Sequence, residues 1–188
     1  MSDGLNDRGK ALEGAFFQQK DQELLIRLRQ ELETEEVKVA LSQSSGIVDE
    51  SLLNQLVELE IEPASFASFA LLPLVEVAWA DGKMQSSERD AILSAAESGG
   101  IQKESVEMEV LDGWLQQPPS AELFEVWKVY AATLSGSLSE EQAKELRDDI
   151  MGRARSVAEA AGGILGFGNK VSDEETEVLD KLSAAFSP

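Results

Sequence analysis

An acidic pair between two predicted helices is the part of this sequence best suited to chemistry. The stretch "LVEVAWADGKMQSSERDAIL" (residues 74–93) contains Asp81 beside Gly82, followed by Glu88. The chain has no histidine and no cysteine, which excludes thiol chemistry, imidazole bases and the usual zinc ligand sets. Only oxygen ligands remain for a metal. Such ligands suit hard cations, so calcium, magnesium and manganese are the candidate ions.

Both carboxylates also have a purely structural interpretation. Asp-Gly is common turn chemistry at the end of a helix. Glu88 is expected at the third position of the next helix, after Gln85, where its side chain would cap the helix and contribute on the order of 1 kcal/mol. A carboxylate is disfavoured near a helix C-terminus, so Asp81 also indicates a nearby cation or a basic partner group. The residues leave capping and ligand binding both open.

A related junction occurs near the C-terminus. The segment "GKMQSSERDAIL" (82–93) aligns with "NKVSDEETEVLD" (169–180) at an offset of 87 residues. Glu88 then corresponds to Glu175, and Ser172 with Glu175 forms a capping box at the start of a helix. We therefore expect a helix-loop-helix unit that occurs twice in the chain.

The motif "AWADGKMQSSE" and its duplication resemble the TerB-like family, named for a bacterial tellurite-resistance protein, over about residues 53–186. The resemblance implies an all-helical domain with two related halves and a role in stress resistance without an established enzymatic activity. It also implies metal binding by acidic residues in the loops. Carried over by position, the ligands would be Asp81, Glu88 and Glu175. The second copy has Gly168-Asn169 where the family pattern has Asp-Gly, which makes the first copy the stronger candidate.

The N-terminal segment predicts a long amphipathic helix. Residues 6–42 are rich in Glu, Gln, Lys, Arg and Leu, and Leu25, Leu28 and Leu32 fall on one stripe. The stretch "NDRGKALEGAFFQQKDQELLIRLR" resembles, more loosely, the start of the zeta-type inhibitor of alpha-proteobacterial F-type ATPases. Because an amphipathic helix must bury its stripe, this one is a candidate to dock on the domain, to bind a partner protein, or to form a homo-oligomer.

The remaining sequence predicts an all-α protein. Apolar residues make up 43% of the 188 positions and recur at helical spacing, without any long stretch of strict alternation. We expect an N-terminal arm over residues 1–45 and a compact multi-helix TerB-like domain over 46–188. The helices of that domain are expected at about 49–60, 63–80, 87–98, 104–117, 121–134 and 139–161, with the last one beginning at 172.

Charge and hydropathy limit the classes of partner. The formal net charge of -20 repels phosphate backbones and anionic membrane surfaces, which argues against nucleic acid and favours cations or a basic partner protein. The most apolar stretch falls short of the roughly 20 residues that a membrane-spanning helix needs. The first residues lack the pattern of a signal peptide. These features predict a cytoplasmic protein that is not transmembrane.

Enzymatic functions fit the sequence less well. The stretch "GGILGFGNK" has the wrong glycine-lysine spacing for a phosphate-binding loop, and no strand is predicted before it. A carboxylate-metal hydrolase would lack histidine to serve as base or to orient the metal. We expect a non-enzymatic interaction module that binds a divalent cation. The alternative is a regulatory or scaffold protein whose N-terminal helix binds a larger complex such as an ATPase.

Overall fold

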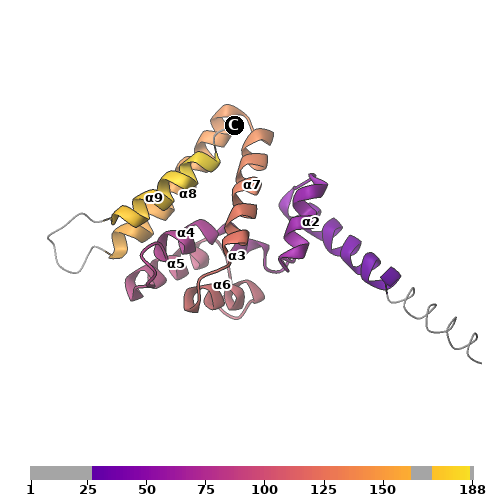
Figure 1. Cartoon of the computed structure of the whole chain (residues 1–188), viewed down its shortest axis with the longest axis horizontal. Helices are drawn as coiled ribbons and strands as arrows, with labels where there is room; N and C mark the ends of the chain where they lie inside the picture. The colour runs from indigo at the N-terminus through magenta and orange to yellow at the C-terminus, as the bar shows by residue number, and fades with distance from the viewer. Residues whose placement is uncertain (1–26, 162–170, 187–188) are drawn as a thin grey trace, which may run out of the picture. The chain divides into compact units, whose positions relative to one another are not determined.

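The computed structural model describes residues 27–161 and 171–186, and all regular elements within these ranges are helices (Figure 1). The all-α prediction is confirmed. A helix covers residues 27–45 of the described part. It is followed by α2 (Glu50–Glu58), α3 (Phe66–Ala70), α4 (Leu72–Ala78), α5 (Ser86–Ser98), α6 (Val106–Gln116), α7 (Ala121–Ser137), α8 (Glu140–Ala161) and α9 (Asp173–Ala185). The chain forms two compact units, residues 1–40 and 41–188.

Side-chain caps set most helix starts where the sequence predicts them. The Asp49 side chain accepts a hydrogen bond from the Leu52 N–H at 2.7 Å and starts α2. At the start of α8, the Ser139 N–H donates to Gln142 Oε1 at 3.1 Å, and the Gln142 N–H donates to Ser139 Oγ at 3.3 Å. These bonds satisfy N–H groups that have no partner inside the helix, which is why Asp and Ser are favoured there.

The prediction of a single helix over residues 63–80 is wrong, because this segment contains the two helices α3 and α4. Pro63 lies in a turn, and the first helix here begins only at Phe66. The reason is local: Ser65 Oγ accepts the Glu62 N–H at 3.1 Å and donates back to the Glu62 carbonyl at 3.2 Å, which closes a turn in competition with the helix. A second break separates α3 from α4, because Pro73 has no N–H to continue the helical hydrogen bonds.

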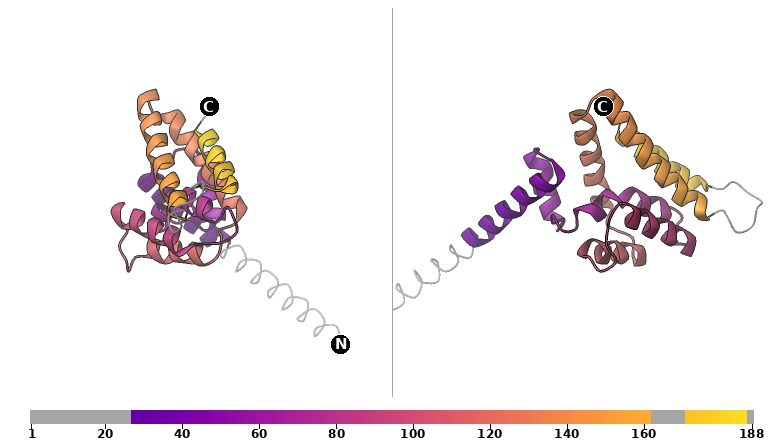
Figure 2. Two further views of the ribbon diagram at one scale, coloured as in Figure 1. Left: turned by 90° about the vertical axis from the view of Figure 1, so that its left-hand side faces the viewer. Right: turned by 180° about the vertical axis from the view of Figure 1, so that it is seen from behind.

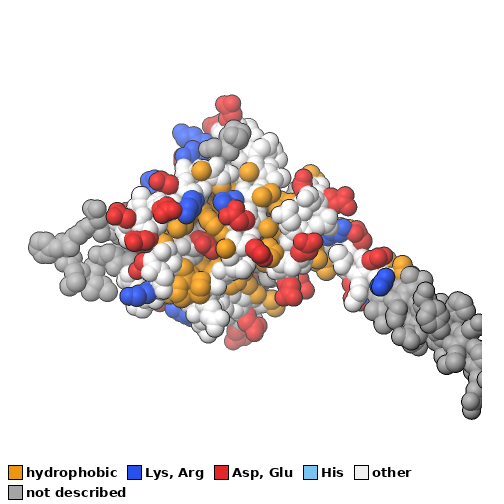
Figure 3. Space-filling model, viewed as in Figure 1, with side chains coloured by type: hydrophobic (Ala, Val, Ile, Leu, Met, Phe, Trp, Pro, Cys, Tyr) orange, Lys and Arg blue, Asp and Glu red, His pale blue; other side chains and the backbone are white. Residues whose placement is uncertain are grey.

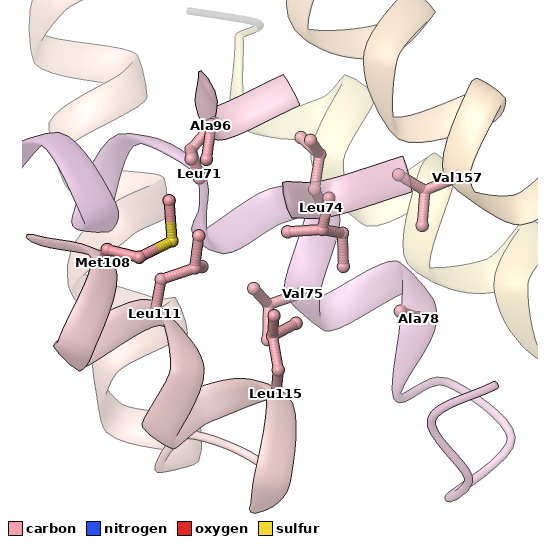
Figure 4. Packing of buried hydrophobic residues seen from close by; sticks show 10 residues of the cluster. Leu71, Leu74, Val75, Ala78, Ala96, Met108, Leu111, Leu115 and Val157 are labelled. Atoms are coloured by element: carbon pink, nitrogen blue, oxygen red, sulfur yellow. The ribbon is translucent and has the colours of Figure 1, made fainter. Parts of the chain in front are cut away.

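The core of the second unit is built around α4. Its buried residues pack with those of α5, α6 and α8, and Figure 4 shows Leu115 of α6 beside Val75 of α4. The cluster consists of Leu71, Leu74, Val75, Ala78, Ile92, Ala96, Met108, Leu111, Leu115 and Val157. In addition, α5 packs against α8, α4 packs against α9, and α8 lies alongside α9 (Figure 2). The helix pair α4–α5 therefore packs against the helix pair α8–α9.

An aromatic group joins α7 to the end of the chain's last helix. Trp127 is 1% exposed, stacks on Phe124 with ring centroids 6.2 Å apart, and meets the edge of Phe186 at 5.9 Å. Trp127 is thus a core residue. In the described ranges, no helix combines the length and the apolar character needed to cross a membrane.

Candidate functional site

Glu88 caps α5, but it is far more buried than a capping residue needs to be. Gln85 precedes the helix in an extended conformation, and its N–H donates to Glu88 Oε2 at 2.8 Å. This is the capping role that the sequence predicts. The side chain is nevertheless only 2% exposed. Glutamate is rarely buried to this extent unless it is paired, so the cap alone does not account for this position.

Glu175 occupies the equivalent position in α9. The Ser172 N–H donates to Glu175 Oε2 at 2.5 Å, and the Glu175 N–H donates to Ser172 Oγ at 3.1 Å. This residue is buried as well, with 6% of its surface exposed. Both helices have 13 residues and hold a buried glutamate at the third position of a capping box. In these features the two junctions are alike, as the alignment predicts.

The structure brings these two carboxyl groups together. The pKa of Glu88 is raised from 4.5 to about 7, first by burial, and further by the charge of Glu175, the charge of Asp81 and a side-chain hydrogen bond with Glu175. The hydrogen bond from the Gln85 N–H acts in the opposite direction. Two carboxylates that share a buried site repel each other, and a proton or a cation between them relieves the repulsion.

Asp81 lies in the turn between α4 and α5, outside the buried pair. Its Oδ1 accepts the Lys83 N–H at 2.9 Å, and Gly82 has a φ of +78°, a left-handed conformation that favours glycine. The side chain is exposed, although its charge raises the pKa of Glu88. Within residues 27–161 and 171–186, no three acidic side chains are gathered closely enough to hold one ion. Glu88 and Glu175 therefore form the candidate site, and Asp81 lies at its exposed edge.

Two further polar residues, one in α5 and one in α4, are not among the predicted site residues. Ser87, which precedes Glu88 in α5, has a buried Oγ without a hydrogen-bond partner in the described part of the chain. No sequence signal distinguishes it from other serines in a first turn. Glu76 in α4 has a pKa raised to about 7 by burial. Its signal was present in the sequence: it is the single charged residue of the apolar helix "LPLVEVA".

Two predicted features cannot be placed. Gly168-Asn169, where the second copy departs from the Asp-Gly pattern, lies outside the described residues. Most of the segment that resembles the ATPase inhibitor also lies outside them.

The chain has no match among the family models, the curated proteins or the solved structures with which it was compared.

Proposed function

We propose that this chain is a non-enzymatic helical module in which Glu88 and Glu175 bind a divalent cation, calcium, magnesium or manganese, in place of a proton. The observation that carries the proposal is the meeting of two buried carboxyl groups from separate helices at one site. Magnesium is commonly held by one or two carboxylates and keeps several water molecules. Two glutamates are thus a sufficient protein contribution, without a third ligand in direct contact.

Asp81 has a secondary role in this proposal. It lies in an exposed turn, close enough for its charge to act on Glu88. A carboxylate in that position can attract the cation and bind it through water. The high negative charge of the chain adds to this attraction, and Figure 3 shows Asp and Glu side chains spread over the visible surface. The likeness of "AWADGKMQSSE" to the TerB-like motif also supports an ion near this turn.

The proposed consequence of binding is mechanical. Each glutamate is fixed by a backbone N–H at the start of its own helix, Gln85 for α5 and Ser172 for α9. A cation shared by both side chains would therefore connect the α4–α5 pair to the α8–α9 pair. Because the ion binds the folded state, it stabilises that packing by mass action. We propose that a partner protein recognises this cation-stabilised form, as in an interaction module of the stress-response type.

Thermal unfolding with and without cations tests the proposal. The protein is treated with excess chelator and then melted with calcium, magnesium or manganese at matched ionic strength, because screening alone stabilises a highly charged chain. At a free cation concentration of about 100 times the dissociation constant, a specific site adds roughly 2.7 kcal/mol to the free energy of unfolding. At this chain length, that raises the melting temperature by several degrees. Glu88→Gln and Glu175→Gln should each abolish the shift.

Glu122→Gln is the matched control, because Glu122 is an exposed first-turn glutamate of α7. It should retain the full shift. A melting temperature that responds equally to every salt, or a cation-specific shift that survives Glu88→Gln, would show that the carboxyl pair is not the site.

A further inference from the structure

The helix over residues 27–45 exposes an apolar stripe. Leu28, Leu32 and Val39 are 46%, 65% and 55% exposed. With 3.6 residues per turn they fall on one narrow strip of the helix, on the side opposite the buried residue Leu41. The other large exposed apolar residues of the described ranges, Val48, Val106 and Val129, are isolated valines in separate parts of the chain. Three such residues on one strip favour a contact surface over chance exposure.

The spacing of the stripe is that of a coiled coil. Leu28, Leu32, Glu35 and Val39 follow one another at intervals of four, three and four residues, which is the alternation of heptad positions d and a. In this register Arg29 and Glu36 occupy e positions beside the seam. Glu31 occupies a g position. These three flanking residues are exposed, whereas the fourth, Lys38 at the second g position, is 8% exposed.

The flanking charges favour a second copy of the same helix in antiparallel orientation. In an antiparallel pair, e positions face e positions, so Arg29 of each copy meets Glu36 of the other. In a parallel pair, g positions face e positions, which would place Glu31 against Glu36 with like charges. Charges at e and g determine partner and orientation in coiled coils. The helix is therefore complementary to itself only when the two copies run in opposite directions.

We propose that two copies of this chain associate through the helix over residues 27–45, packed antiparallel along Leu28, Leu32 and Val39, with Arg29 of each copy paired to Glu36 of the other. Leu32 then faces Glu35 of the second copy at the centre. Glu35 forms an ion pair with Lys38 of its own helix at 2.5 Å. A charged residue at a seam position weakens a coiled coil. Association is therefore concentration-dependent, and it is stronger when salt screens the repulsion between two acidic chains.

Sedimentation of the full-length chain from micromolar to millimolar concentration, at physiological and higher salt, tests the association. The expected result is a reversible monomer–dimer equilibrium. Leu32→Asp should leave a monomer throughout this range, with unchanged helix content by circular dichroism. The matched control is Val129→Asp, which alters an exposed valine of α7 and should dimerise like the native chain. A native chain that stays monomeric throughout, or equal effects of the two variants, would overturn the proposal.

Charge exchange tests the orientation. Arg29→Glu and Glu36→Arg should each weaken dimerisation roughly tenfold, because each change affects two symmetric contacts. The double variant restores opposite charges across an antiparallel seam, so its affinity should return to near the native value. Residues 29 and 36 lie too far apart on one helix for the rescue to arise within a single chain. A double variant as weak as the single variants would disprove the antiparallel pairing, and Glu35→Leu should tighten the dimer.

Discussion

Glu88 and Glu175, which are 87 positions apart in the sequence, meet at the starts of α5 and α9, each fixed by the N–H of the residue that precedes its helix. Caps are normally surface features, yet both of these side chains are buried. The same glutamate therefore serves two purposes. Each glutamate caps the start of its own helix through one oxygen. Each also places its carboxyl group against that of the other glutamate.

This arrangement predicts that stability falls as pH rises toward neutrality. The pKa of Glu88 is about 7 in the folded protein and about 4.5 in the unfolded chain, so the folded state holds its proton more tightly. Stability from this group is complete below the unfolded pKa and is lost as pH rises through about 7. Glu76, whose pKa is also about 7 because of burial, acts in the same direction.

Urea denaturation with chelator present measures the effect. We expect the free energy of unfolding to decrease by about 2 kcal/mol in total between about pH 5 and about pH 8, after allowance for solvent screening. Glu88→Gln and Glu76→Gln should each flatten part of this slope, because glutamine does not titrate. A slope that is unchanged in the double variant would show that neither carboxyl group causes it.

Cation binding at the carboxyl pair should compete with protons. If Glu88 must lose its proton to bind the ion, the affinity should rise with pH by up to about tenfold per unit below the pKa of Glu88 and level off above it. Calorimetry in two buffers with different ionisation enthalpies should show release of up to one proton per bound ion near pH 6. Equal heats in both buffers, with affinity independent of pH, would place the ion elsewhere.

Local features of this fold can be predicted from the sequence because neighbouring residues determine them. Asp49 and the Ser139–Gln142 pair start their helices through bonds that span three residues. The positions of Glu88 and Glu175 within their helices are set in the same way. The helix start predicted at Pro63 is wrong because proline suits the first turn of a helix and a β-turn equally well. The Ser65 hydrogen bonds that select the turn depend on a local geometry that composition does not show.

The meeting of the two glutamates could not be predicted in this way. It depends on α5 packing against α8 and on α4 packing against α9, and these contacts join distant parts of the chain. An internal alignment shows that Glu88 and Glu175 are equivalent, but equivalent residues can lie at opposite ends of a molecule. The burial of Glu76 has the same origin, because the helices that cover α4 come from later in the sequence.

The core around α4 should be sensitive to the loss of volume. Leu111 of α6 is completely buried among residues of this cluster. Leu111→Ala should lower the free energy of unfolding by about 2–5 kcal/mol, because it removes buried surface and leaves a cavity. Val106→Ala is the control from the same helix, since Val106 is 53% exposed, and it should change stability by less than about 0.5 kcal/mol. Denaturant midpoints compare the two, and similar losses would contradict the packing described for α6.

Gly82, in the turn beside the candidate site, and Gly113, an exposed residue of α6, should respond oppositely to substitution by alanine. Gly82 has a φ of +78° in the turn that holds Asp81, and an added Cβ would meet no atom within 4 Å. Gly82→Ala should therefore destabilise by about 1 kcal/mol through backbone strain alone. Gly113 lies inside α6 with equal space around it and no positive φ, so Gly113→Ala should stabilise by about 0.5–1 kcal/mol through helix propensity. Thermal melts of the two variants give the signs directly. A stabilising effect of Gly82→Ala would mean that the turn is not left-handed and that Asp81 is held differently.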